Sequence, residues 1–199
     1  MNLPNKISLT RICMIPVFVL VFFLDGVLPF SYGIAAIIFA VAACTDFIDG
    51  HIARSRGLVT NLGKFLDPIA DKVLVSTAML LILTMKNVLF AKVDAISDSL
   101  YVVTAVCICI IMARELIISA FRQIAAVNGI VMAADMLGKY KTTFQDISIF
   151  VLIFAADIVG GAGVVLFWIG FGLFMVATVL TVWSGISYVV KNKQVLKDN

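Results

Sequence analysis

Two uncharged stretches of the sequence are long enough to cross a lipid bilayer, and they limit the fold more than any other feature. Residues 26–45 and 158–190 contain no Asp, Glu, Lys or Arg, and a membrane-spanning helix needs about 20 mostly apolar residues. The chain of 199 residues is 62% hydrophobic and only 14% charged, whereas soluble domains carry about 25% charged residues. These figures exclude an ordinary soluble domain and a disordered chain. They predict an all-α integral membrane protein.

Glycine, proline and clusters of charge divide the hydrophobic sequence into six predicted transmembrane helices. The predicted spans cover residues 9–24, 32–54, 62–85, 99–127 and 139–156, and a sixth follows Gly160-Gly161 and ends near Val190. A short N-terminal interfacial helix is expected to begin at residues 5–8, and the polar segment 86–98 is expected to be a loop. No small-x-small cleavage site follows the first apolar stretch, so we expect a retained span rather than a signal peptide. Residues 1–199 are predicted to form one domain.

Most of the 15 Lys and Arg residues fall on one side of these six spans. Those on the side of the two termini are Lys6, Arg11, Arg54, Arg56, Lys64, Arg122, Lys139, Lys141, Lys191, Lys193 and Lys197. Cytoplasmic loops of membrane proteins carry an excess of Lys and Arg. This face is therefore predicted to be cytoplasmic, with both termini on it.

Four aspartates interrupt the second and third predicted spans, in a helical register shared with small residues and one arginine. The residues in this register are Asp46, Asp49, Gly50, Ala53 and Arg54 on the second span and Gly63, Asp67 and Asp71 on the third. Their spacing of three or four residues places each set on one face of a helix. Each intramembrane carboxylate costs about 2.5–3.5 kcal/mol to insert, so stability gives no reason to keep four. The connection between the spans is short, and we expect the two faces to oppose each other near the basic side.

Four carboxylates in one cleft repel one another unless some are protonated or divalent cations bind between them. The donors are all oxygen, without a cluster of His and Cys, which favours a hard ion such as Mg²⁺ or Mn²⁺ over zinc. Two ions about 3.5–4 Å apart would suit four carboxylates and would grip phosphate oxygens. The alternatives are ion-paired aspartates or a divalent-cation transporter. No acidic residues continue the route across the bilayer, which makes a transporter the more remote interpretation.

The pattern Asp46-x2-Asp49-Gly50-x2-Ala53-Arg54-x8-Gly63-x3-Asp67-x3-Asp71 resembles the signature of the CDP-alcohol phosphatidyltransferases, with every position present. The resemblance implies a six-span helical membrane domain, usually homodimeric, with a cleft open to the cytoplasmic side. It implies that two divalent cations are held by Asp46, Asp49, Asp67 and Asp71 and that Asp71 deprotonates the acceptor hydroxyl. It also implies that the CDP group is bordered by Gly50, Ala53, Arg54 and Gly63.

Three further stretches are similar to bacterial members of the same family, although they are less specific than the aspartates. They are Leu3–Arg11, Ala113-Arg114-Glu115 and Gly138–Thr143. This wider similarity implies that the protein lies in the cytoplasmic membrane of a bacterium. Its substrate would be CDP-diacylglycerol, attacked by an alcohol oxygen at the phosphorus that carries the lipid, with CMP as the leaving group.

Four basic residues near the cytoplasmic face bear on the identity of the acceptor alcohol. A dianionic acceptor such as glycerol 3-phosphate needs about two cations, and Arg114, Lys139 and Lys141 are the expected ligands of its phosphate, with Arg122 as a further candidate. The product would be phosphatidylglycerophosphate. Inositol phosphate, serine and phosphatidylglycerol stay open as acceptors. Structural interpretations also stay open, in which Arg114 pairs with Glu115 and the lysines anchor helices at the membrane surface.

Several polar and aromatic residues outside this cluster receive weaker predictions. Asn5 and Thr10 lie where the N-terminal helix could pass under the cleft and touch the nucleotide, although helix capping explains them equally well. Trp168, Trp183 and Tyr188 are predicted to lie at the membrane interface or to face lipid. The expected partners are the two substrates, membrane lipid and a second copy of the chain. We expect no nucleic-acid partner.

Overall fold

The computed structural model describes residues 3–55, 61–127 and 136–193. The side chains of residues 3–8, 46–55, 61–68, 94–95 and 127 lie outside this description. Every regular element in the described part of the chain is helical. The α-helices are α1 (Leu3–Phe22), α2 (Ser31–Ser55), α3 (Asn61–Thr84), α4 (Ser97–Val127), α5 (Met136–Asp157) and α6 (Gly161–Lys191), and the 3-10 helix η1 covers Phe90–Ile96.

The six helices confirm the predicted all-α architecture, and two details differ from the prediction. The N-terminal segment is not a separate interfacial helix, because α1 runs without a break from Leu3 through Pro16 to Phe22. The segment predicted as a loop contains η1. Phe90 explains this helix, since its ring is 1% exposed and packs edge-on against Tyr101 and Phe167. Burial of one aromatic ring thus orders a polar connection.

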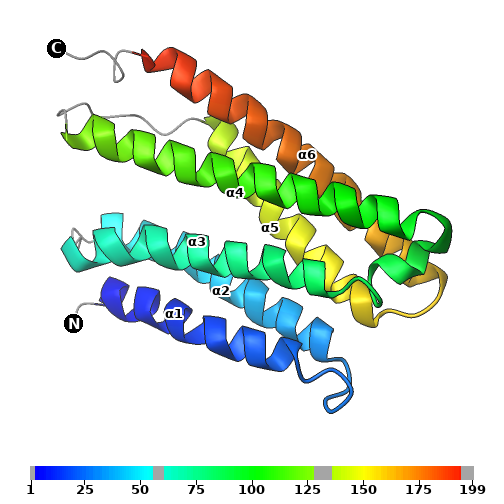
Figure 1. Cartoon of the computed structure of the whole chain (residues 1–199). Coiled ribbons are helices and arrows are strands. Elements are labelled where there is room, and N and C mark those ends of the chain that lie inside the picture. Colours follow the sequence, from blue (N-terminus) through cyan, green and yellow to red (C-terminus); the bar gives the residue numbers. More distant parts are fainter. Residues whose placement is uncertain (1–2, 56–60, 128–135, 194–199) are drawn as a thin grey trace.

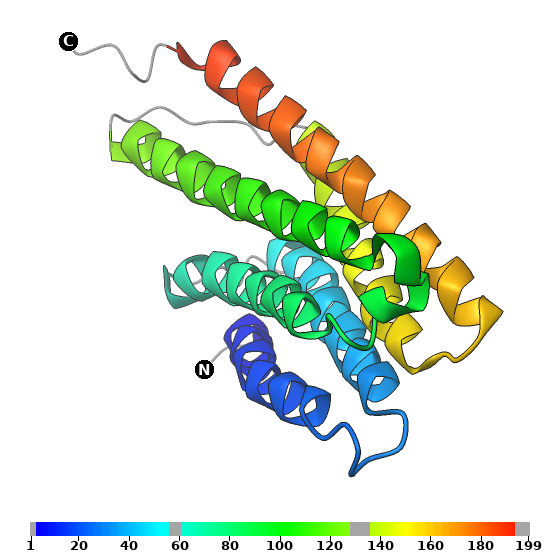
Figure 2. The same cartoon turned by 45° about the vertical axis from the view of Figure 1, so that its right-hand side comes forward.

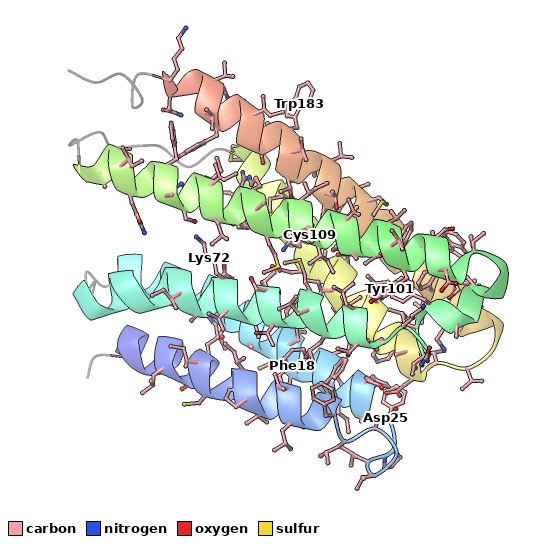
Figure 3. The ribbon with its side chains drawn as sticks, viewed as in Figure 1. Phe18, Asp25, Lys72, Tyr101, Cys109 and Trp183 are labelled. Carbon is pink, nitrogen blue, oxygen red and sulfur yellow. The ribbon has the colours of Figure 1, made fainter. Side chains whose placement is uncertain are left out.

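The outer surface of the bundle is apolar, as expected for a protein surrounded by lipid. By length and composition, Ser97–Ala126 of α4 and Gly161–Lys191 of α6 can each cross a bilayer. Large apolar side chains point outward from these helices, among them Leu116 (68% exposed) and Trp183 (67% exposed), and Figure 3 shows Trp183 directed away from α6. A soluble protein rarely exposes apolar surface on this scale. The fold is that of an integral membrane protein.

The helices lie side by side, and alternate connections meet at opposite ends of the bundle (Figure 1). The beginnings of α1 and α3 and the ends of α2, α4 and α6 lie at one end, which we call the site end. The connections α1–α2, α3–α4 and α5–α6 lie at the other, the turn end (Figure 2). The closest packing is between α5 and α6, α1 and α2, and α2 and α5, whereas α4 packs mainly on α6 and η1. The arrangement of the helices therefore brings basic segments that are far apart in the sequence to the same end of the bundle.

The turn end is held by short polar contacts between its connections. Asp157 at the end of α5 accepts a hydrogen bond from the backbone N–H of Gly33 at 2.7 Å, and Lys92 of η1 donates to the carbonyl of Ile158 at 2.8 Å. Burial lowers the pKa of Lys92, and the nearby charge of Asp157 opposes this by raising it. Gly160 has a φ of 76°, a left-handed conformation that glycine adopts without strain. These contacts join α2, η1 and the α5–α6 turn.

Candidate functional site

Asp71 stands at the wall of a polar cavity at the site end of the bundle. Helix α3 carries it, and the facing walls come from α4, α5 and α6. This space, which we call the cation cavity, has a volume of about 310 Å³. It is lined by Asp71, Lys72, Arg114, Glu115, Ile118, Ser119, Arg122, Gly138, Lys139, Lys141, Thr142, Ser184 and Tyr188.

The cation cavity gathers residues that the sequence places far apart. All four basic residues predicted to bind the acceptor phosphate line it: Arg114 and Arg122 from α4, and Lys139 and Lys141 from α5. Lys72 is the fifth cation in the lining, and it was not predicted from the sequence as a site residue. It extends from α3 toward α4 (Figure 3), where its amino group contacts the Ser119 hydroxyl. A surplus of positive charge in an enclosed polar space favours an anion.

Glu115 joins two of these cations through one carboxylate oxygen. Arg114 Nη1 lies 3.2 Å from Glu115 Oε1, and the amino group of Lys141 forms an ion pair with the same oxygen. Lys141 is only 3% exposed, and a buried ammonium group needs such a partner. The Arg114–Glu115 pair that the sequence suggested as a structural alternative therefore exists, and Arg114 lines the cavity at the same time.

Helix α6 supplies polar partners for both arginines of α4. Arg114 Nη2 donates to Ser184 Oγ at 2.9 Å, and Arg122 Nε donates to the Tyr188 hydroxyl at 3.1 Å. Tyr188 is 4% exposed. The prediction that Tyr188 faces lipid is therefore wrong, because the ring is buried between α4 and α6. The signal for these contacts was present but weak: polar residues one helical turn apart in an otherwise apolar span share one face.

A second, smaller cavity of about 110 Å³ adjoins the first. The two cavities share Asp71, Lys72, Glu115, Lys141 and Thr142. The wall of the smaller one also includes Gln145, which is 3% exposed and donates weakly to the sulfur of Met79 at 3.6 Å. Its Oε1 atom has no hydrogen-bond partner among the described residues. Gln145 was not predicted from the sequence, and its buried acceptor faces the same region as Asp71.

The structure describes the remaining residues predicted to bind the nucleotide and the metals only in part. Those whose side chains lie outside this description are Asn5, Asp46, Asp49, Gly50, Ala53, Arg54, Gly63 and Asp67. Their backbones belong to α1, to the last turns of α2 and to the first turns of α3. Thr10 is exposed on α1 and is not part of either cavity wall.

Helices α2 and α3 contact each other and meet at the site end (Figure 1), so the aspartate-bearing turns share the end that carries Asp71. Among the described side chains, no group of three His, Cys, Asp or Glu residues could hold a metal. The donor set of four carboxylates on adjoining helices fits a hard divalent cation in chemistry.

A helical membrane bundle with a carboxylate and five cations around one cavity is suited to moving a phosphorylated group at a membrane surface. Residues 1–184 match the family described as CDP-alcohol phosphatidyltransferase, and the chain belongs to this family. The resemblance carried by the aspartate signature is thereby confirmed. Members of the family generally depend on a divalent cation.

Individual relatives extend the comparison over most of the chain. The CDP-diacylglycerol--glycerol-3-phosphate 3-phosphatidyltransferase of Bacillus subtilis (strain 168) is 37% identical over 162 residues, which cover 76% of both chains. The protein of the same name from Escherichia coli (strain K12) is 38% identical over 192 residues, which cover 94% of this chain and 92% of the relative.

Proposed function

We propose that this protein is an enzyme that transfers the phosphatidyl group of CDP-diacylglycerol to glycerol 3-phosphate, forming phosphatidylglycerophosphate and CMP. The observation that carries the proposal is the lining of the cation cavity, which includes both Asp71 and five cations. Two relatives of 37% and 38% identity bear the name of this activity. Family membership also speaks against the transporter alternative.

In this proposal the basic residues bind the phosphate of the acceptor. A glycerol phosphate dianion is attracted by Arg114, Arg122, Lys139 and Lys141, and an arginine can hold two phosphate oxygens at once. The binding of the phosphate in the cation cavity would leave the acceptor hydroxyl toward Asp71, which lines the same cavity. An uncharged alcohol would leave the cations uncompensated. The site is therefore expected to prefer a phosphorylated acceptor.

Asp71 acts as the general base of the reaction. The acceptor oxygen forms a bond to the phosphorus that carries the diacylglycerol, the bond from that phosphorus to the oxygen of CMP breaks, and the hydroxyl proton passes to Asp71. Proton transfer by a positioned carboxylate typically contributes about 10²–10⁴-fold to the rate. No covalent enzyme intermediate is required, and CMP departs with the electron pair of the broken bond.

Two divalent cations, Mg²⁺ or Mn²⁺, complete the proposed site. Asp46, Asp49, Asp67 and Asp71 would hold them, and the bound ions would neutralise the diphosphate of CDP-diacylglycerol. The CDP group would lie against Gly50, Ala53, Arg54 and Gly63, with Asn5 and Thr10 at its edge. We also propose a homodimer in the cytoplasmic membrane of a bacterium, with the site end facing the cytoplasm.

An acceptor panel tests the proposal. Purified protein in mixed micelles with Mg²⁺ and CDP-diacylglycerol is supplied with glycerol 3-phosphate, inositol phosphate, serine, glycerol or phosphatidylglycerol, and CMP release is measured. We expect release with glycerol 3-phosphate and formation of a lipid that carries its phosphate. Preferential turnover of any other alcohol would replace the proposed acceptor. Uptake of the metal into liposomes without CMP release would contradict the proposal and support the transporter interpretation.

A further inference from the structure

We infer that Ser184, Gly185 and Tyr188 of α6 are positioning residues, which set the two arginines of α4 in place to receive the acceptor phosphate. The inference rests on the proposed function, since it concerns the phosphate-binding part of that site. It adds a role for a helix that carries none of the aspartates and none of the predicted phosphate ligands.

Arg114 is held on two sides by α6. Its Nη2 donates to Ser184 Oγ at 2.9 Å, and the Ser184 hydroxyl donates in turn to the carbonyl of Thr181 at 3.2 Å. The serine proton is thus engaged within α6, which leaves a lone pair directed at the guanidinium. Ser184 is 1% exposed, so water does not compete for this contact. The serine therefore orients the end of the Arg114 side chain.

Gly185 provides the space in which the stem of Arg114 lies. A Cβ atom at this position would come within 3.0 Å of Arg114 Cγ and 3.2 Å of Arg114 Nε. The absence of a side chain thus lets the arginine pass close against α6. The Nε atom of Arg114 is buried without a hydrogen-bond partner among the described residues. Such an unmet donor is costly, so the arginine is held here at some cost in stability.

Tyr188 holds Arg122 in a comparable way, one helical turn further along α6. Arg122 Nε donates to the Tyr188 hydroxyl at 3.1 Å, and the guanidinium carbon lies 5.2 Å from the centre of the ring. The ring is fixed in turn by an edge-on contact with Phe121 at 6.3 Å. Both the hydroxyl and the ring face of one buried tyrosine therefore orient Arg122.

The two arginines held by α6 line the same cavity. Arg114 and Arg122 are eight residues apart, or about 12 Å along α4, whereas Ser184 and Tyr188 are four residues apart, or about 6 Å along α6. The longer reach of the tyrosine side chain spans part of this difference, and both arginines line the cation cavity. An unrestrained arginine would lose side-chain rotamer entropy on binding a phosphate. Holding both in advance lowers that cost and strengthens binding of the acceptor.

The test compares two glycines of the same helix. Gly185→Ala crowds the stem of Arg114, which must give way by a few tenths of an ångström, whereas Gly172→Ala is the matched control, because nothing lies within 4 Å of a Cβ added at Gly172. Full-length protein is assayed for CMP release while each substrate is varied in turn. We expect Gly185→Ala to raise the KM for glycerol 3-phosphate on the order of tenfold and to leave the KM for CDP-diacylglycerol within about twofold. Gly172→Ala should change neither.

Three further variants keep the test decisive if Gly185→Ala folds poorly. Ser184→Ala removes one hydrogen bond, and Tyr188→Phe removes the hydroxyl but keeps the ring against Arg122. We expect each to raise the KM for glycerol 3-phosphate by about threefold to tenfold, with Tyr188→Ala larger than Tyr188→Phe. Unchanged values, or equal increases for both substrates, would overturn the positioning role and leave these residues as packing between α4 and α6.

The wild-type protein separates this outcome from failure of the proposed function. If the wild type uses glycerol 3-phosphate and the α6 variants show no selective change in KM, the function stands and the inference fails. If the wild type prefers another phosphorylated alcohol, the same comparison is made with that alcohol, and a selective increase supports the inference although the proposed acceptor is wrong. Preference for an uncharged alcohol would overturn both.

Discussion

The two ends of the bundle use charged residues in different ways. At the turn end the described charges are matched by local partners: Lys86 pairs with Asp98 at 3.0 Å, Tyr32 donates to Asp25 at 2.9 Å, and Asp157 accepts the N–H of Gly33 at 2.7 Å. At the site end, the described residues in the wall of the cation cavity include five cations and two carboxylates, Asp71 and Glu115. At the turn end each described charge has a local partner, whereas the cavity wall carries more described cations than carboxylates.

The difference indicates which charges serve stability and which serve binding. Paired groups at the turn end join connections that would otherwise move independently, and their loss should affect folding alone. The cations of the site end repel one another in the absence of an anion, so they are not arranged for the greatest stability. Substitutions at the turn end should therefore affect unfolding alone, whereas those at the site end should alter activity, with an added effect on unfolding where the cation is ion-paired, as Lys141 is with Glu115.

The largest effect is expected for Asp71→Asn. The amide keeps the size of the side chain but removes the proposed base, so kcat should fall by about 10³-fold. Because Asp71 belongs to the cavity wall rather than to the apolar core, the unfolding temperature should change little. Measurement of CMP release at saturating substrates, together with thermal unfolding in detergent, checks both statements. A kcat within tenfold of the wild type would remove Asp71 from proton transfer.

A smaller effect, now on both activity and stability, is expected for Lys141→Met. The substitution leaves the carboxylate of Glu115 with Arg114 alone, and breaking a buried ion pair costs about 3 kcal/mol. The double variant Lys141→Met/Glu115→Gln removes both charges and should recover most of the free energy of unfolding. It should not recover the KM for glycerol 3-phosphate. Recovery of acceptor binding in the double variant would show that Lys141 acts on Glu115 rather than on the phosphate.

At the turn end, Asp157→Ala should reduce stability without altering catalysis. It leaves the Gly33 N–H without its acceptor and removes the charge that raises the pKa of Lys92 against the effect of burial. Loss of a hydrogen bond to a charged group lowers the free energy of unfolding by about 2 kcal/mol. The KM values of both substrates should equal those of the wild type. A selective change in either KM would contradict the division between the two ends.

The fold was largely predictable because the membrane requires long apolar helices. Uncharged stretches and their Gly and Pro breaks placed all six helices, and the main errors concern local contacts. Helix η1 depends on burial of Phe90 against Phe167, a residue of α6 that the local pattern of residues 86–98 does not reveal. Likewise, the polar residues 5–8 were predicted as a separate interfacial helix, whereas they continue directly into the first span as part of α1.

The charged residues of the site were predictable, because a charge within a membrane span needs an explanation. The small or weakly polar residues of the site were not, because they fit an apolar span. Arg114, Arg122, Lys139 and Lys141 were identified as a group because cations near one face of a membrane bundle require an explanation, and the structure brings them to one cavity. Their roles remain proposals. The contacts from α6 were not predicted, because a serine, a glycine and a tyrosine are common in an apolar span. Ser184 and Arg114 are 70 residues apart, and no short-range pattern joins them.

The smallest effect is expected for the Lys86–Asp98 pair. Its side chains are 48% and 86% exposed, and exposed ion pairs contribute about 0–1 kcal/mol. Lys86 also lies 5.3 Å from the centre of the Tyr101 ring, so Lys86→Met loses a cation–π contact but retains an apolar stem against the ring. We expect the free energy of unfolding to fall by less than about 1 kcal/mol. Part of this loss should disappear at 1 M salt, where exposed charges are screened. Asp98→Asn, which leaves the ring contact intact, should cost less than Lys86→Met, and the reverse order would assign the contribution to the ion pair rather than to the aromatic ring.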